Sequence, residues 1–285
     1  MEFTLEKLRE GMEVVGITGE RKAWLESLWD EIKEWLPVKY AEVMSFWPED
    51  RRVDMPSELD ESHQNALFIC LYCFLTEPSR ALYLEKGYSL ENWQDNMPDL
   101  LDHAHDENGE IWMDTLHGEF GWHLSILNGK NIKLGRLQFY PLLCQMDYPS
   151  VGLKKGDHLV GFHIPAGSPM TPESCLDSFA RARKFFAERT PAWEFSHFYC
   201  ASWLFNPIYQ KYLPPTSNIV KVQKMGTIIP NKNDSRDAIR RVFSFGHEDV
   251  NTPTPRTSMQ RAVQQILKNG EDIGYGIIVF PRDIK

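Results

Sequence analysis

The stretch from residue 158 to residue 205 limits the possible folds more than any other part of the sequence. It reads as an apolar strand, HLVGFHIP, then a helix over residues 172–188, then a second buried strand, HFYCASWLF. A strand, a helix and a strand in this order predict a parallel pair joined by a crossover connection, which is right-handed in nearly all proteins. The chain is therefore expected to contain a β-α-β unit within an α/β or α+β fold.

The start of the helix at residues 172–188 has a local signature. Thr171 is expected to be the N-cap, and Pro172 takes the first helical position, where proline is tolerated. In the preceding loop, Gly167 and Ser168 let the backbone approach a ligand. Because a helix N-terminus presents unpaired N–H groups and a partial positive charge, loop and helix start together are expected to hold phosphate. A plain strand-to-helix connection remains the alternative, since neither a P-loop nor a GxGxxG fingerprint is present.

The first 115 residues differ from the rest in charge and pattern. They hold 26 acidic and 10 basic residues, a balance of −16, whereas residues 116–285 have a balance of +7. The segment ERKAWLESLWDEIKEWL places apolar residues on one helix face, and residues 63–84 form an apolar helical run that Pro78 is expected to interrupt. The basic C-terminal part would attract a phosphate-bearing ligand, or the two parts attract each other. We expect an α+β (α/β) chain, with a helical domain over residues 1–116 and a mixed domain over residues 117–285.

Further elements are expected after Gly118. WHLSIL and IKLGRLQFYP read as strands, with Asn128-Gly129 as a hairpin turn between them. After the β-α-β unit we expect a short helix in PIYQKYL, strands in NIVKVQKMGTII and RRVFSFG, a helix in TSMQRAVQQILKNG and a final strand in YGIIVF. Thr257 or Ser258 is the expected cap of that last helix.

Composition narrows the setting. The sequence lacks the roughly 18 to 20 consecutive uncharged apolar residues of a membrane span and the pattern of a signal peptide. Five cysteines, an odd number in a large chain, favour a reducing, cytoplasmic environment. The single CxxC pair, Cys70 and Cys73, favours core packing over zinc, and His103, His105 and Asp106 favour a solvated loop over a metal site. We expect no metal, no membrane and no nucleic-acid partner.

Side chains at the ends of the two parallel strands are the candidates for chemistry. His163 precedes the loop and would act as a general base for an attacking amine, or it is a core histidine bonded to a backbone carbonyl. Ser202 shares a strand face with Cys200, which is either a nucleophile or, as buried cysteines usually are, inert. Tyr209 and Tyr212 follow at helical spacing, and a tyrosine hydroxyl suits protonation of a leaving thiolate.

Five motifs in order resemble those of a bacterial two-domain acyltransferase family, in which a helical N-terminal acyltransferase domain precedes a GNAT-like C-terminal domain. The motifs are LGRLQF, HIPAG before a helix, CASWLFNP, LPPTSNIVKVQ and PRTSMQRAV. The resemblance covers residues 117–285 by motif, and residues 1–116 only in being helical. It implies an acetyl-CoA or other acyl-CoA co-substrate, whose pantetheine arm lies where two parallel strands separate.

The resemblance also implies roles for individual residues. The CoA pyrophosphate would lie on the loop that includes Ile164, Ala166, Gly167 and Ser168. Asn206 and Tyr209 would lie near the pantetheine, and Tyr209 or Tyr212 near the thiolate. The usual Arg/Gln-x-x-Gly-x-Gly/Ala cradle is missing from PAGSPMTPES, and Asn206 stands where the family motif has an acidic residue.

Together these features predict a CoA-dependent N-acyltransferase that moves an acyl group to a small-molecule amine by direct attack. His163, Ser202 and Tyr212 are the expected catalytic residues. The acidic helical domain would attract a cationic acceptor. A non-catalytic CoA-binding or regulatory protein is the main alternative, and the missing cradle and the lack of a catalytic glutamate favour it. An interaction module is a third, which an exposed patch of Trp24, Trp29 and Trp35 would support. The sequence carries no signal for an oligomeric state.

Overall fold

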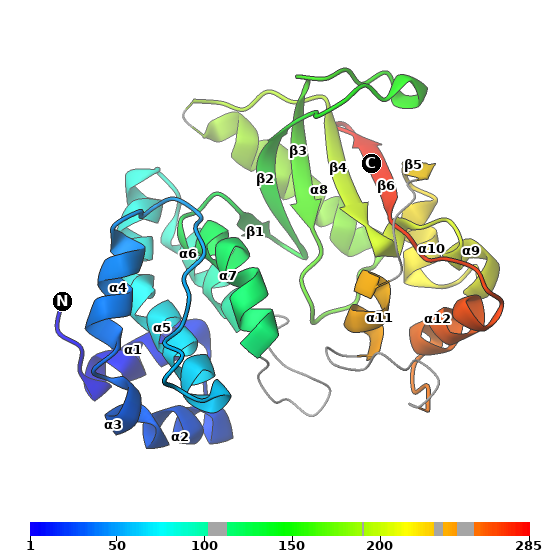
Figure 1. Cartoon of the computed structure of the whole chain (residues 1–285). Helices are drawn as coiled ribbons and strands as arrows, with labels where there is room; N and C mark the ends of the chain where they lie inside the picture. Colours follow the sequence, from blue (N-terminus) through cyan, green and yellow to red (C-terminus); the bar gives the residue numbers. More distant parts are fainter. Residues whose placement is uncertain (102–112, 190, 231–235, 244–253) are drawn as a thin grey trace. The chain divides into compact units, whose positions relative to one another are not determined.

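The computed structural model describes residues 1–101, 113–189, 191–230, 236–243 and 254–285. The chain forms two compact units, Met1–Lys133 and Leu134–Lys285. The first is built mainly of helices, and the second carries the six-stranded sheet except for the start of its first strand, Ile132–Lys133 (Figure 1). The domain boundary expected from the sequence, after residue 116, falls within helix α7 (Met113–Leu127). An α+β chain with an N-terminal helical part is confirmed.

The helical unit is assembled around one long apolar helix, α5 (Glu61–Glu85), whose N-cap Asp60 accepts a hydrogen bond from the His63 amide. The predicted interruption at Pro78 is wrong, because the helix continues through the proline. Packing along the buried face of α5 outweighs the one backbone hydrogen bond that a proline removes. The other described helices of this unit are α1 (Leu5–Val15), α2 (Gly19–Ser27), α3 (Trp29–Ile32), α4 (Leu36–Met44), α6 (Leu90–Asn96), the 3₁₀ helix η1 (Met97–Leu101) and α7.

Helix α5 is the one described helix long and apolar enough to cross a membrane by length and composition alone. In the structure 67% of its apolar window is buried, as in the core helix of many proteins without a membrane span. Cys70 and Cys73 lie on this helix as buried free thiols, which confirms core packing for that pair.

WHLSIL, predicted as a strand, lies in helix α7 instead. The buried residues of α7 include Phe120, His123, Leu124 and Leu127. This spacing of three to four residues is that of one helix face. Phe120 packs on Phe68 of α5, with ring centroids 5.5 Å apart. The strand prediction failed because a short apolar run fits both periods, and only contact with α5 decides between them.

A mixed sheet organises the second unit, with the strand order β1-β2-β3-β4-β6-β5. Strands β3 and β4 are parallel, as predicted, while β2–β3, β4–β6 and β5–β6 are antiparallel. The strands are β1 (Ile132–Leu134), β2 (Leu137–Leu143), β3 (His158–His163), β4 (His197–Ser202), β5 (Thr227–Pro230) and β6 (Gly276–Pro281).

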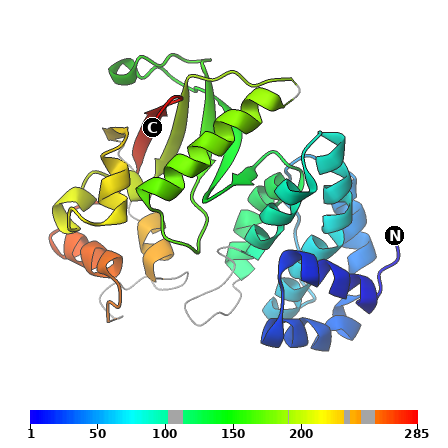
Figure 2. The same ribbon diagram turned by 180° about the vertical axis from the view of Figure 1, so that it is seen from behind.

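Helix α8 (Pro172–Glu188) connects β3 to β4 and covers one face of the sheet (Figures 1 and 2). Its bounds are those predicted. Phe179 of the helix stacks on Phe198 of β4 at 4.5 Å and contacts Phe280 of β6 at 5.0 Å between ring centroids. Phe139 of β2 and Phe162 of β3 complete this aromatic core, which fixes α8 and its N-terminus against the sheet.

Of two more strand predictions, one is right only at its C-terminal end and the other is wrong over its described residues. NIVKVQKMGTII forms helix α10 (Asn218–Gln223) before it enters β5, and RRVFSFG begins as helix α11 (Arg236–Phe243). In both cases residues with high strand propensity pack as helices, because tertiary contacts override a propensity scale of about 1 kcal/mol. Helix α12 (Ser258–Lys268) is confirmed with Thr257 as its cap, and PIYQKYL contains the short helix α9 (Tyr209–Tyr212).

Candidate functional site

The two parallel strands separate at their carboxyl ends. The pairs between β3 and β4 are Leu159 with His197, Val160 with Phe198 and Gly161 with Tyr199. Beyond these pairs, each strand stays paired with its outer neighbour only. Strand β3 pairs with β2 as far as His163, and β4 pairs with β6 as far as Ser202. Within the described strands, the inner edges beyond Gly161 and Tyr199 are therefore not joined to each other. Their backbone groups are available to a ligand that enters between the strands.

The predicted cap of α8 is confirmed beside this opening. Thr171 and Ser174 form a capping box, in which the Ser174 amide donates to Thr171 Oγ1 at 3.2 Å and the Thr171 amide donates to Ser174 Oγ at 3.0 Å. Gly167 in the preceding loop has φ +98°, and open space lies where a Cβ would be. Such a φ is strained for other residues, so glycine shapes this exposed turn. The loop can thus present its backbone to an anion.

An acidic side chain also lies at this helix start. The pKa of Glu173 is lowered by hydrogen bonds from its own backbone N–H and from the Thr171 hydroxyl. The carboxylate thus takes up part of the positive potential that a phosphate would otherwise meet. Lys221 of α10 also lowers the pKa of Glu173 through its charge, so α10 approaches the same end of α8.

Arg136 holds the loop before α8 in place. Its Nε donates to the carbonyl of Ser168 at 2.7 Å, and its backbone N–H donates to Ser178 Oγ at 2.8 Å. Gly135 before it has φ +76°, and a Cβ there would lie 2.9 Å from Ser178 Oγ. The turn between β1 and β2 therefore packs directly on α8 and delivers a guanidinium to the predicted phosphate loop. Arg136 stands in the motif LGRLQF, but nothing in the local sequence indicates its position beside the loop.

His163 ends β3 at the opening and is held neutral. Burial lowers its pKa to about 4, and the charges of Arg241 and then Arg136 act in the same direction. A neutral imidazole is the form that accepts a proton, although a pKa of about 4 makes His163 a weaker base than an ordinary histidine. Arg241 comes from α11, a segment predicted as a strand and given no functional role, so its contribution was also missed.

Ser202 and Asn206 lie at the carboxyl end of β4 in local hydrogen bonds. Ser202 Oγ accepts from the Leu204 amide at 3.3 Å. Asn206 Nδ2 donates to the carbonyl of Gly274 at 2.9 Å, and its Oδ1 accepts from the Ile208 amide at 2.9 Å. These bonds give both side chains a structural part in shaping the turn after β4. Cys200 is buried, and burial raises its pKa, which opposes a nucleophilic thiolate.

The two tyrosines of α9 have different surroundings. Tyr209 is fully buried, burial raises its pKa, and its hydroxyl has no hydrogen-bond partner among the described residues. The Tyr212 hydroxyl donates to Glu271 and accepts from Asn269 Nδ2 at 2.7 Å. The residue predicted to protonate a thiolate is thus already bonded to a carboxylate, whereas the hydroxyl of its neighbour on α9 is unpaired.

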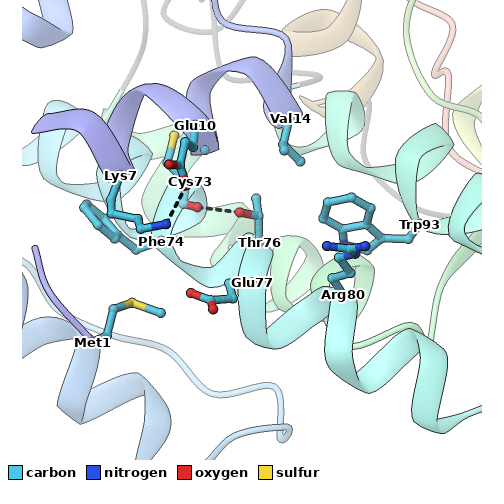
Figure 3. Close-up of a pocket in the computed structure, with 11 residues that line it drawn as sticks. Met1, Lys7, Glu10, Val14, Cys73, Phe74, Thr76, Glu77, Arg80 and Trp93 are labelled. Atoms are coloured by element: carbon cyan, nitrogen blue, oxygen red, sulfur yellow. Dashed lines mark hydrogen bonds and ion pairs between the residues drawn. The ribbon is translucent and has the colours of Figure 1, made fainter. Parts of the chain in front are cut away.

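A cavity of about 270 Å³ lies in the helical unit, between α1, α5 and Trp93 of α6 (Figure 3). Lys7 and Glu10, which pair at 2.7 Å, are among the residues that line it, and the Arg80 side chain lies beside Trp93 (Figure 3). It shares no residue with the predicted site. In the described part of the chain no group of three or more His, Cys, Asp or Glu is placed to hold a metal ion. His103, His105 and Asp106 lie outside the described residues.

Three aromatic residues proposed as an exposed patch do not form one. Trp29 is buried, and Trp24 and Trp35 are both partly buried. Trp29 packs towards Phe74 of α5, with ring centroids 6.4 Å apart. The interaction-module alternative therefore loses the feature that would have supported it.

The second unit has the features of a GNAT-like domain. Its parallel strands β3 and β4 separate at their carboxyl ends, α8 connects them and is capped beside the opening, and the antiparallel strands β6 and β5 follow β4 in the sheet. The chain belongs to the family of the GNAT-like C-terminal domain, whose profile matches residues 132–279. This confirms the family resemblance for the C-terminal part of the chain.

Solved structures with the same overall fold are acyltransferases. One is an acyltransferase in complex with decanoyl-CoA and teicoplanin, with a TM-score of 0.69 and 20% identity, covering 97% of this chain and 86% of that one. A mutant acyltransferase in complex with octanoyl-CoA gives 0.69 and 19% over the same shares. A third, in complex with CoA and 10C-teicoplanin, gives 0.68 and 19%, again covering 97% and 86%. At these identities the likeness shows the fold. A comparison with curated protein sequences finds no match.

Proposed function

We propose that this protein is a CoA-dependent N-acyltransferase, which moves an acyl group from acyl-CoA to an amine by direct attack. The observation that carries the proposal is the separation of β3 and β4 after Gly161 and Tyr199. An extended pantetheine arm can enter there and bond to the inner strand edges as a strand would. The acyl-CoA complexes of the similar structures support this co-substrate.

The phosphates of CoA would bind at the loop before α8. Ile164, Ala166, Gly167 and Ser168 offer backbone groups there, and Arg136 supplies a positive charge through the guanidinium that holds Ser168. A guanidinium suits phosphate because it is permanently charged and presents several donors in one plane. Arg136 thus compensates for the missing glycine cradle. Asn206, in the turn after β4, and Tyr209 of α9 would line the pantetheine.

The reaction itself needs a neutral amine, a base and an acid. The amine nitrogen attacks the thioester carbonyl, and backbone N–H groups of β3 stabilise the oxyanion. His163, directly or through a water molecule, takes the proton that the nitrogen loses. As the C–S bond breaks, the thiolate takes a proton from a tyrosine, Tyr212 or Tyr209. Ser202 is proposed to contribute a polar hydroxyl group at the opening between β3 and β4. Binding and orientation supply much of the rate, because the two reactants are held together.

The acceptor is proposed to be a small-molecule amine. One similar structure is a complex with both decanoyl-CoA and teicoplanin, which supports a small-molecule acceptor. The excess of acidic residues in the first part of the sequence would raise the local concentration of a cationic amine. Five free cysteines, all buried, support the proposed cytoplasmic setting.

Thermal unfolding with CoA and acyl-CoAs, followed by a thiol-release assay with an amine panel, tests the proposal. A ligand at about 100 times its dissociation constant stabilises the native state by roughly 2.7 kcal/mol. We expect an upward shift with acyl-CoA and amine-dependent release of CoA. No shift with any CoA compound would refute the co-substrate.

A non-catalytic CoA-binding protein is the second candidate. The bond from the Tyr212 hydroxyl to Glu271 and the use of Asn206 in the backbone turn favour it, since both predicted groups are occupied. It predicts the same thermal shift with no thiol release for any amine. Release that depends on the amine would exclude it.

A further inference from the structure

One row of side chains crosses the sheet at the point where β3 and β4 separate. Tyr140 of β2 is paired with Gly161 of β3, which is paired with Tyr199 of β4. Residues directly opposite each other on neighbouring strands point to the same face. The row lies on the face opposite α8, because the adjacent residues Phe139, Phe162 and Phe198 form the core beneath that helix. It is the last complete row before the opening.

Gly161 is required in this row because the ring of Tyr140 lies over it. A Cβ at position 161 would be 2.4 Å from Tyr140 Cε2 and 2.5 Å from its Cζ, and 2.9 Å from the hydroxyl oxygen. The ring thus occupies the space that a β3 side chain would fill. A glycine within a strand commonly marks such a close approach of another group. Tyr140 reaches across β3 rather than standing upright on β2.

The far end of the Tyr140 ring comes close to β4. Burial, and to a smaller extent the electrostatic influence of Cys200, raise its pKa to about 12. Tyr140 in turn contributes to the raised pKa of Tyr199, for which burial and the hydroxyl of Tyr148 are the larger causes. The Tyr148 and Tyr199 hydroxyls are 3.3 Å apart. The rings of Tyr140 and Tyr199 therefore lie over the inner end of the opening on this face.

The opposite face of the same opening is closed by the aromatic core. Phe162 and Phe198 both pack on Phe179 of α8, with centroids 5.5 and 4.5 Å away. All three side chains are at most 3% exposed. An acyl chain directed inward between the strands can extend on the α8 side only by displacing a packed core, which is strongly resisted. On the other side the Tyr140 ring stands over Gly161.

We propose that Tyr140 is the specificity-determining residue that limits the acyl group to a short chain. This inference rests on the proposed function. The ring covers Gly161 at the inner end of the β3–β4 opening, so a chain longer than a few carbons meets it. Each methylene group that is kept from burial weakens binding by about fourfold, so the preference for short chains grows steeply with length.

The test compares acetyl-, butyryl-, hexanoyl-, octanoyl- and decanoyl-CoA in the thiol-release assay. For the Tyr140→Ala variant we expect the ratio of kcat/KM for decanoyl-CoA over acetyl-CoA to rise by about tenfold or more. Tyr140→Phe keeps the ring and should keep the short-chain optimum. Tyr148→Ala is the matched control: it removes a tyrosine from the same face, one ring further from Gly161, and should leave the optimum unchanged.

Binding of the matching S-alkyl-CoA thioethers by calorimetry gives a second readout that does not need turnover. Tyr140→Leu, which keeps apolar contact with Gly161, replaces Tyr140→Ala if the latter does not fold. An unchanged chain-length optimum in a folded, CoA-binding variant would overturn the role of Tyr140 and leave the proposed function intact. Absence of both CoA binding and thiol release in the unaltered protein would overturn both.

Discussion

At the scale of single residues, His163 is the side chain whose surroundings most alter its chemistry. Its pKa is about 4 in the folded protein against an ordinary value of 6.5. Between these two values the unfolded chain binds a proton that the folded protein does not, so stability is lost as the pH falls from 6.5 to 4. The loss is at most about 3 kcal/mol for a shift of this size. Urea unfolding at several pH values should show it.

The matched variant for this prediction is His163→Gln, which carries no titrating group. Its stability should depend less on pH over the same interval, while both proteins behave alike above pH 7. Below the folded pKa both states of His163 are protonated, so the two curves should again run parallel. Curves that run parallel throughout the interval from 6.5 to 4 would show that His163 keeps an ordinary pKa.

A second prediction follows from the charges that act on His163. After burial, Arg241 and Arg136 lower its pKa, and Arg136 also holds the loop that we assign to the CoA phosphates. An anion bound beside these guanidinium groups offsets their field, so the His163 pKa should rise when CoA binds. NMR titration of the imidazole with and without saturating CoA measures this. A pKa that stays constant at saturation would place the phosphates elsewhere.

At the scale of elements, the turn after β4 and the start of β6 are fitted to each other. A Cβ on Gly276 would lie 1.8 Å from the carbonyl oxygen of Phe205 and 2.2 Å from its carbonyl carbon. Backbone cannot yield as a flexible side chain does, so Gly276→Ala should destabilise the protein by roughly 2–4 kcal/mol. Chemical unfolding gives the value directly.

Gly118→Ala in α7 is the control for the change in size and backbone freedom. Among the described residues, no atom outside the helix's own backbone lies within 4 Å of a Cβ at this exposed helical position. Alanine should therefore stabilise α7 by roughly 0.5–1 kcal/mol. Equal effects at positions 118 and 276 would mean that the close approach of Phe205 and Gly276 is relaxed in solution.

Elements with a local signature could be predicted from the sequence, and those decided by distant contacts could not. Helix α8 was predicted to the residue because Thr171 and Pro172 mark its start chemically. WHLSIL and RRVFSFG were assigned as strands, since short apolar runs do not reveal the helices they pack against. The phosphate loop could be proposed from its own residues. Arg136 could not, because its role depends on a turn that lies beside α8 only in three dimensions.

At the scale of the whole molecule, the chain consists of two compact units with different compositions. Met1–Lys133 is helical, and Leu134–Lys285 contains all the residues predicted to bind CoA or to catalyse. A ligand stabilises the part of a protein whose folded state it binds. Saturating CoA should therefore slow amide hydrogen exchange in residues 161–172 and 197–212 and in the turn that carries Arg136.

Exchange within α1 to α5 should change little in the same experiment, because local opening is governed by the contacts of each region. The cavity lined by Lys7, Glu10 and Arg80 lies in that helical unit. The measurement therefore distinguishes a ligand site in this cavity from one at the β3–β4 opening. Protection confined to α1 and α5 would transfer the ligand site to this cavity and refute the β3–β4 opening as the place of CoA. Protection at residues 161–172 that is lost in an Arg136→Ala variant would instead tie the phosphates to the loop that Arg136 holds.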